Sequence, residues 1–454
     1  VLFVAACFVG GSSTNDNPDG STANVTYYKD VAPIIQNHCQ SCHVPGGIGA
    51  FPLLTYDDAH ANSDDIVYET GARNMPPWGA RTTNECTPRF GWKNDPTLSD
   101  AEIATLASWH AGGDVAGDPN DAPPPSTTPP LTDLPNSTSL APTTPFSLSG
   151  QADYFRCFVL DPQITQKEYI TGTFVKPGNT TIVHHALLFS VPAGATIPPP
   201  DDPNVPNQYT CFGSANVTGQ QLMAVWTPGG QPFAYPPDVG QPVEAGTKFI
   251  MQIHYHPHAN ATTDPDTSTF EYTATTTQPT WGVLPELVGN FKTAVNAKGI
   301  GLMNPPFTIP PNTPSTQFTM QYTEPTSIPI PLKILAVAAH MHLVGVDEKI
   351  SLHRANGTAD QPTDECMLQV PSWDFNWQRA YQYNTDISTL PTIAPGDVAQ
   401  IRCTYDNTLQ NPWVAQALSE QGLTQTQTVT LGETTLDEMC LGAFWLVAPA
   451  ALLP

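Results

Sequence analysis

Three short apolar stretches of the chain carry histidines in pairs, a pattern that suits metal binding. His340 and His342 lie within residues 337–345, where a short apolar run predicts a buried strand. Residues two apart on a strand point to the same face, so both imidazoles can reach one metal ion. Two further runs of the same kind carry their own histidine pairs. The repeated pattern predicts a protein built to hold metals.

The second pair, His184 and His185, occupies neighbouring positions of a predicted strand over residues 182–189. Neighbouring side chains on a strand diverge, so these two can bind one metal only from opposite sides. That arrangement suits a nearly linear or T-shaped copper(I) site better than tetrahedral zinc. A later apolar strand offers a third imidazole, from His254 or His256, which lie on the same face. These residues alone leave the choice between the two open.

A methionine near the end of the chain can complete a second copper site. Met439 lies between an acidic residue and a cysteine, ahead of an apolar run. Thioether sulfur is a soft ligand that favours copper(I), and two histidines with one methionine leave positions open for dioxygen. His340, His342 and Met439 therefore form a candidate ligand set. The alternative is that Met439 is a core residue of a terminal strand.

A Cys-x-x-Cys-His sequence near the start of the chain is typical of covalent haem attachment. Cys39 and Cys42 would form thioethers to a c-type haem, and His43 would bind the iron. Further along, Ser99 and Glu102 form a capping signal at the start of an amphipathic helix. The motif and the helices around it predict a small, all-α haem domain.

The distal haem ligand is predicted to be Met75, which follows the haem motif at a suitable distance. His60 and His110 are the alternatives. Histidine–methionine ligation tends to raise the reduction potential of a haem. Residues 27–117 resemble a class I-like cytochrome c domain, and the resemblance implies that this part of the chain accepts and passes on single electrons.

Composition limits the remaining options. The 454 residues carry a formal net charge of −25, which argues against nucleic acid or an anionic membrane surface as a partner. The 49 prolines and the short apolar runs that end at turn residues predict mostly β structure with long loops. Nine cysteines indicate an oxidising compartment. The proline-rich stretch over residues 118–146 predicts a semi-rigid linker.

The start of the chain predicts a lipid anchor. Residues 1–6 are apolar and end in small residues before Cys7, as at the end of a bacterial lipoprotein signal. Cys7 would carry the lipid, and the polar residues up to 26 would form a tether. The expected location is the bacterial cell envelope, on its periplasmic side or surface. No other segment is apolar enough to span a bilayer.

From about Phe146 to Pro454 the chain resembles the type II copper, ascorbate-dependent monooxygenases, represented by peptidylglycine alpha-hydroxylating monooxygenase and dopamine beta-monooxygenase. Four motifs, in the family's order, carry the resemblance: His184-His185, Gln252-Ile253-His254-Tyr255, His340-Met341-His342 and Asp437-Glu438-Met439-Cys440. The second motif selects His254 as the third ligand of the first copper ion. The fourth makes Met439 the third ligand of the second copper ion.

The resemblance implies two all-β, jelly-roll-like sandwich domains, over residues 147–300 and 301–454. Each would hold one copper ion, and the two ions would face each other across an open cleft. Two disulfides match family positions, Cys157–Cys211 and Cys403–Cys440. Cys86 and Cys366 match no family position, and a bond between the cytochrome and the oxygenase is one option for them.

The resemblance also implies the chemistry. The first copper stores and delivers an electron, and the second binds dioxygen, takes a hydrogen atom from a substrate C–H bond and returns a hydroxyl group. The peptide-amidating relatives carry an arginine, an asparagine and a tyrosine where this chain has Ala338, Leu441 and Ala443. The substrate pocket is therefore expected to be apolar and unsuited to a glycine-extended peptide.

We expect an enzyme with two copper ions and one haem c that hydroxylates an unknown small molecule. An external donor, either a small molecule like ascorbate or a redox protein, would reduce the haem. The haem would then pass electrons to the first copper ion and so to the second. The alternative is a non-enzymatic lipoprotein that carries electrons or binds copper. Retention of six copper ligands in the family's order favours the enzyme.

Overall fold

The computed structural model describes residues 25–45, 49–125, 134–148, 153–227, 230–256, 264–290, 295–296, 306–325, 329–375, 377–432, 434 and 436–453. The predicted lipid anchor at Cys7 and most of its tether lie outside the described residues, as does the predicted domain boundary near Gly301. Within the described part, the chain is mostly β structure. The helices found there include none that is both long enough and apolar enough to cross a membrane.

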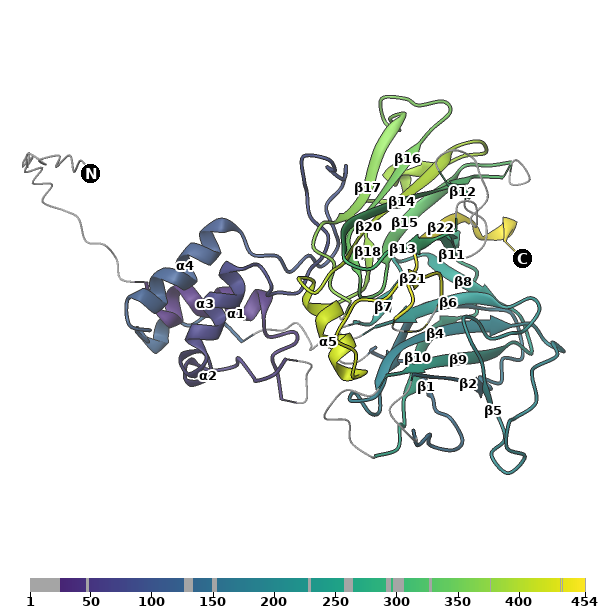
Figure 1. Ribbon diagram of the computed structural model, residues 1–454, viewed down its shortest axis with the longest axis horizontal. Helices are drawn as coiled ribbons and strands as arrows, with labels where there is room; N and C mark the ends of the chain where they lie inside the picture. The colour runs from purple at the N-terminus through teal and green to yellow at the C-terminus, as the bar shows by residue number, and fades with distance from the viewer. Residues whose placement is uncertain are drawn as a thin grey trace, which may run out of the picture.

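Residues 27–117 form a helical segment that lies to one side of the strands in Figure 1. Its helices are α1 (Ala32–His38), α2 (Tyr56–Ala61), α3 (Ser63–Gly71) and α4 (Asp100–Ala111), preceded by the π-helical turn η1 (Tyr27–Val31). The predicted capping box is present: the Ser99 side chain accepts from the Glu102 backbone, and the Glu102 carboxylate accepts from the Ser99 backbone. Trp109 and Leu106 of α4 are buried in a hydrophobic core that belongs to the helical segment and is separate from the cores of the sheets.

A five-stranded sheet in the order β5-β2-β9-β4-β6 carries the first group of histidines. Its strands are β2 (Tyr154–Leu160), β4 (Val183–Val191), β5 (Gln208–Thr210), β6 (Gln221–Trp226) and β9 (Lys248–Tyr255). Apolar residues from this sheet, among them Leu188 and Met251, pack against Ile170 and Phe270 of a second sheet. The two layers form a sandwich, as expected for strands with one apolar face.

The second sheet runs through both parts of the β structure. Its main path among the described strands is β1-β10-β3-β8-β11-β22-β15-β18, with β7 and β19 joined at its sides. Its strands are β1 (Thr138–Leu140), β3 (Glu168–Lys176), β7 (Phe233–Ala234), β8 (Val239–Val243), β10 (Thr269–Thr275), β11 (Trp281–Gly289), β15 (Leu332–His340), β18 (Ala380–Gln382), β19 (Thr392–Ile393) and β22 (Leu441–Pro449). Pairing of β11 with β22 over nine residue pairs joins the two parts into one continuous sheet.

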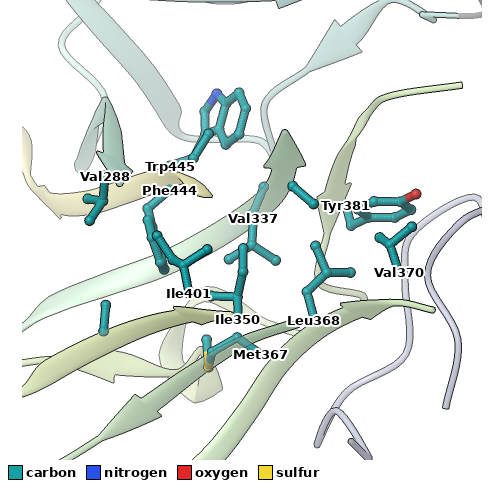
Figure 2. Close-up of a cluster of buried hydrophobic side chains, with 14 of the residues drawn as sticks. Val288, Val337, Ile350, Met367, Leu368, Val370, Tyr381, Ile401, Phe444 and Trp445 are labelled. Atoms are coloured by element: carbon teal, nitrogen blue, oxygen red, sulfur yellow. The ribbon is translucent and has the colours of Figure 1, made fainter. Parts of the chain in front are cut away.

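A third sheet has the strand order β12-β14-β20-β16-β17. It packs against the part of the second sheet that contains β22 and β15. Its strands are β12 (Val295–Asn296), β14 (Thr313–Thr323), β16 (Gly345–His353), β17 (Asp364–Val370) and β20 (Val398–Asn407). Figure 2 shows the core between these layers, where Val337 and Phe444 face Ile350 and Ile401. The smaller elements are β13 (Thr308–Ile309), β21 (Val429–Thr430), α5 (Pro412–Glu420), η2 (Pro119–Asp121), η3 (Ile387–Thr389) and η4 (Ala450–Leu452).

A loop between α3 and α4 fastens the helical segment to the third sheet (Figure 1). Cys86 forms a disulfide with Cys366 of β17, across 280 residues of sequence. Trp92 forms a β-bridge with Tyr383 and stacks on its ring. The bond between the two regions, one option left by the sequence, is therefore present. The stretch predicted as a linker also contributes to the fold, because β1 pairs with β10.

Candidate metal centres

The first candidate site brings together three imidazoles from two paired strands. His184 and His185 lie on β4, and His254 lies on the neighbouring β9. The His185 Nδ1 atom is 3.1 Å from His184 Nδ1 and 3.4 Å from His254 Nδ1. One nitrogen from each of the three rings falls within 4.8 Å of the others. Three convergent imidazole nitrogens are a suitable donor set for copper.

A β-bulge explains how neighbouring residues reach the same point. Val183 pairs with Tyr255 and His185 pairs with His254, so His184 is an extra residue in β4. A bulge breaks the strict alternation of side chains and re-aims the residue that it inserts. The expectation that His184 and His185 bind from opposite sides assumed a regular strand. In the structure their Nδ1 atoms lie side by side instead.

His254, rather than His256, joins this group. The His254 ring stacks on Phe155 with 4.2 Å between ring centroids, which fixes its orientation. His256 turns towards a carboxylate, and its Nδ1 lies 2.5 Å from Asp153 Oδ1. Asp153 raises the pKa of His256 against the effect of burial, which favours an ion pair. His254 Nε2 also lies 3.5 Å from the same Asp153 oxygen, so the two histidines share this carboxylate, and His256 makes the shorter contact.

Burial keeps the grouped imidazoles neutral. It is the main cause that lowers the pKa values of His184 and His185 well below the usual value, and the neighbouring imidazoles lower them further. Burial also lowers the pKa of His254. A neutral imidazole has a free lone pair, which is the form that binds a metal ion. The His184 Nε2 atom is buried without a hydrogen-bond partner among the described residues.

The second candidate site lies where β15 ends. His340 is the last residue of β15, and His342 follows in a turn before β16, so the strand is shorter than the predicted run over 337–345. The His340 Nδ1 lies 2.6 Å from Gln378 Oε1, and the His342 Nδ1 lies 3.0 Å from the Asp437 carbonyl oxygen. Each Nδ1–H donates to an oxygen, so each Nε2 carries the free lone pair. Burial is the main cause that lowers the pKa of His342 to about 3.

Met439 lies beside these histidines, two residues before β22 begins. It is buried and lines the same cavity as His340 and His342. The next residue, Cys440, is joined to Cys403 by a disulfide. The Tyr405 hydroxyl donates to the Met439 carbonyl oxygen at 2.6 Å. The Met439 backbone is therefore held on both sides.

Glu438 is a residue of this site to which the sequence assigned no role. Its buried carboxylate accepts hydrogen bonds from the backbone N–H groups of His342 and Met439. It thereby ties the turn after β15 to the segment before β22. Burial raises the pKa of Glu438 to about 8 in spite of these bonds. Its place inside the Glu-Met-Cys motif was the signal available in the sequence.

The two groups of histidines adjoin each other. The ring centroids of His185 and His340 are 6.5 Å apart, one from each candidate site. Phe375 contacts both sites: its ring stacks on His184 with 4.4 Å between centroids and meets His342 edge to face at 6.0 Å. The sequence led us to expect an open cleft between the two copper ions. The structure instead has the two sites in contact through aromatic rings.

Residues of both sites line one cavity of about 250 Å³. His185 lies on its wall together with His340, His342 and Met439. Ala338, Leu441 and Ala443, which the sequence predicted to make the pocket apolar, line it as well, as do Met223, Phe233 and Trp445. A mostly apolar cavity with metal-binding groups in its wall is the usual form of a small-molecule site.

Comparison with known proteins supports the same assignment. Residues 143–262 match the N-terminal domain, and residues 297–446 the C-terminal domain, of the copper type II ascorbate-dependent monooxygenases. The two matches together span more than half of the chain. The protein belongs to this family. A copper type II monooxygenase is an enzyme, so the non-enzymatic alternative is not supported.

Solved structures add little to this family assignment. The match with the major capsid protein P2 of bacteriophage PM2 covers 69% of this chain and 97% of the capsid protein chain, at 8% identity and a TM-score of 0.26. The match with a structure of the infectious bursal disease virus Gx strain covers 72% of this chain and 78% of the viral chain, at 10% identity and a TM-score of 0.16. Scores this low carry no structural or functional argument for the monooxygenase.

The predicted haem residues lie together in the helical segment of this monooxygenase. Cys39 and Cys42 follow α1 directly and form no disulfide, whereas the other described cysteines pair into three. The predicted bonds Cys157–Cys211 and Cys403–Cys440 are both present. His43 Nδ1 donates to the Phe51 carbonyl oxygen at 2.8 Å, so its Nε2 is free for a ligand.

The proposed distal ligand and its alternatives differ in their surroundings. Met75 is half-buried in the loop after α3. His110 lies 3.0 Å from Asp64 and 3.2 Å from Asp114, and His60 lies 3.6 Å from Asp114. Both ring nitrogens of His110 thus face carboxylates, whereas His60 uses only its Nδ1 in this way.

Proposed function

We propose that this copper monooxygenase hydroxylates a C–H bond of a small, mostly apolar substrate with dioxygen, using electrons that pass through a haem c in its helical segment. Membership of the copper type II ascorbate-dependent monooxygenases carries the reaction class. The lining of the cavity supports the substrate class, and the motif at Cys39, Cys42 and His43 supports the haem.

His184, His185 and His254 would hold the first copper ion through Nδ1, and His340, His342 and Met439 would hold the second, with the histidines binding through Nε2. The opposite choice of nitrogen at the two sites follows from the hydrogen bonds that His340 and His342 make with Nδ1. Bound copper supplies electron storage at the first site and dioxygen activation at the second. The single observation that carries this proposal is that His185 of the first donor set and all three members of the second line one cavity.

The apolar wall around Ala338, Leu441 and Ala443 would hold the substrate next to the second site and keep water away from the reacting C–H bond. Ala338, Leu441 and Ala443 stand where the peptide-amidating relatives carry an arginine, an asparagine and a tyrosine, although Lys93 and Arg379 also line the cavity. A small, mostly apolar molecule is therefore a better candidate than a glycine-extended peptide.

The haem would be attached through Cys39 and Cys42, with His43 and Met75 as axial ligands. The two thiols remain unpaired in a chain whose other described cysteines are oxidised, which supports a separate use for them. The three disulfides support an oxidising, extracytoplasmic compartment. Anchoring of the protein to the bacterial envelope through Cys7 remains a prediction.

A substrate screen with isotopically labelled dioxygen tests the proposal. The reduced, copper-loaded protein is incubated with a panel of apolar small molecules and, separately, with a glycine-extended peptide. We expect label in the product of an apolar compound and no hydroxylation of the peptide. Hydroxylation of the peptide alone would contradict the substrate assignment, and oxygen uptake without labelled product would contradict the reaction.

A further inference from the structure

The charged side chains that line the copper cavity are cationic. Lys93 and Arg379 line it, whereas its described lining residues include no aspartate or glutamate. The chain as a whole has 41 acidic residues against 16 lysines and arginines. The wall of the cavity therefore reverses the charge of the protein locally, and a local field of this sign attracts anions.

Arg379 forms no ion pair within the described part of the chain. Its guanidinium lies over the ring of Trp78, 5.0 Å from the ring centroid. Its Nε is buried, and no hydrogen-bond partner for it is found among the described residues. Burial lowers the pKa of Arg379, while Tyr381 and Asp95 act in the opposite direction. A cation that has lost water without gaining an anion is costly, and a ligand that brings a negative charge removes that cost.

The short strand β18 places Arg379 beside the second copper site. Ala380, the first residue of β18, pairs with Ala338 of β15, two residues before His340. The residue before Arg379 is Gln378, whose Oε1 accepts a hydrogen bond from His340 Nδ1 at 2.6 Å. Arg379 therefore follows directly on a residue that contacts a candidate copper ligand.

The helical segment holds Lys93 against the same strand. The Lys93 backbone N–H donates to the Gln382 carbonyl oxygen at 2.8 Å. The residue before it, Trp92, forms a β-bridge with Tyr383. Lys93 is exposed and Arg379 is half-buried. The lysine therefore lies where the cavity meets solvent, and the arginine lies deeper in its wall.

The remainder of the wall indicates the shape of the ligand. Ala338, Leu441 and Ala443 line the cavity together with His340 and Met439 and make this part apolar. A ligand that fits both parts has an apolar body beside the second copper site and a negative group at the two cations. A carboxylate suits the arginine especially, because its two oxygens match the fork of a guanidinium.

We propose that Arg379 and Lys93 form an anion subsite, which binds the carboxylate of a small apolar substrate and holds its hydrocarbon part at the second copper site. This inference rests on the proposed function, because it takes the ligand of the cavity to be the substrate of the monooxygenase. The cations come from β18 and from the helical segment, and neither stands at Ala338, where the peptide-amidating relatives carry an arginine. The helical segment thus contributes a residue to the substrate site.

Binding of matched acids and amides tests the subsite. Benzoate, 4-phenylbutyrate and octanoate, each beside its primary amide, are titrated into the copper-loaded protein without oxygen, and calorimetry gives the dissociation constants. At neutral pH and low ionic strength we expect at least one acid to bind roughly ten-fold more tightly than its amide, as for a hydrogen bond to a charged group. Without the subsite, the net charge of −25 would make each acid the weaker ligand.

Three variants locate the preference for the acid. Arg379→Met should remove it, so that acid and amide bind alike, while the amide binds as in wild type. Lys93→Met should reduce it about three-fold, since the lysine is exposed. Lys167→Met is the control and should keep it, because this lysine pairs with Glu244 outside the cavity. If Arg379→Met does not fold, Lys93→Met carries the test, because replacing an exposed side chain leaves the core unchanged.

Equal binding of acids and amides by the wild-type protein would overturn the subsite, as would a preference that survives in both Arg379→Met and Lys93→Met. Absence of binding by every acid would overturn it too. Since binding is measured without turnover, its result is separate from the reaction. An acid preference without labelled product would contradict the proposed function alone, and labelled product with equal affinities would contradict the subsite alone.

Discussion

At the scale of single residues, the side chains around His254 and His256 indicate which of the two histidines is the third ligand of the first copper ion. Both residues belong to the same run of sequence and both contact Asp153, but His256 makes the shorter contact, at 2.5 Å, while the Phe155 ring stacks on His254. We expect His254→Ala to lose one copper ion per chain and His256→Ala to keep both. Elemental analysis of the two purified variants, each compared with wild type, measures this. Retention of copper in His254→Ala together with its loss in His256→Ala would reverse the assignment.

A second prediction at this scale concerns a carboxyl far from the copper residues. Glu324 follows β14, and burial, with Glu286 and Asp397 nearby, raises its pKa from 4.5 to about 7. Because the pKa of Glu324 is higher in the folded than in the unfolded protein, its contribution to stability is fully present at pH values below the unfolded-state pKa of 4.5. This contribution is lost as the pH rises through the folded-state pKa of about 7. Glu324→Gln should therefore raise the free energy of unfolding at pH 8 by about 1 kcal/mol, a value reduced for solvent screening.

Denaturant unfolding at two pH values checks the Glu324→Gln prediction. At pH 4 the carboxyl is mostly protonated in both states of the wild-type protein, so variant and wild type should unfold alike. Equal stabilisation at both pH values would show that the effect comes from packing and not from charge.

At the scale of elements, the segment before β22 matters most because it carries Met439. The Cys403–Cys440 disulfide joins it to β20, and a loop closure of this size typically contributes roughly 2–4 kcal/mol. We expect the double variant Cys403→Ala with Cys440→Ala to lose about that much stability and to bind copper more weakly at the second site only. Thermal melting and copper titration measure the two effects. Equal weakening at both sites would contradict this local role.

The pattern of apolar residues in the sequence predicted the strands that carry the histidines, but it did not predict where those strands are irregular. The apolar runs around His184, His254 and His340 all form strands, and the capping signal at Ser99 starts α4. The bulge at His184 and the early end of β15 were missed. Both depend on pairing with strands far away in the sequence, which a local pattern does not contain.

At the scale of the whole molecule, the helical segment is an attached part of the oxygenase. The sequence predicted a semi-rigid linker over residues 118–146 between the cytochrome-like region and the oxygenase. The structure ties residues 79–93 to the C-terminal copper domain through the Cys86–Cys366 disulfide, through Trp92 on Tyr383 and through Arg89 to Glu365. The sequence offered the two cysteines without partners but no means to choose their pairing.

Removal of the Cys86–Cys366 bond should separate the unfolding of the two regions. We expect Cys86→Ser with Cys366→Ser to add a calorimetric transition below the main one, because the helical segment then unfolds without the constraint of the cross-link. In protein that carries the proposed haem, loss of haem absorbance would assign that transition to the helical segment. A single transition shifted as a whole would mean that the non-covalent contacts alone keep the regions cooperative.

The central claim is that two different donor sets, one of three histidines and one of two histidines with a methionine, hold copper at one cavity. X-ray absorption at the copper edge of the reduced protein, combined with copper analysis, tests it most directly. We predict two copper ions per chain and a copper–sulfur distance that disappears in Met439→Ile, while haem absorbance and nitrogen ligation remain. A sulfur signal that survives in Met439→Ile, or a wild-type protein with one copper ion and all its ligands intact, would contradict the account.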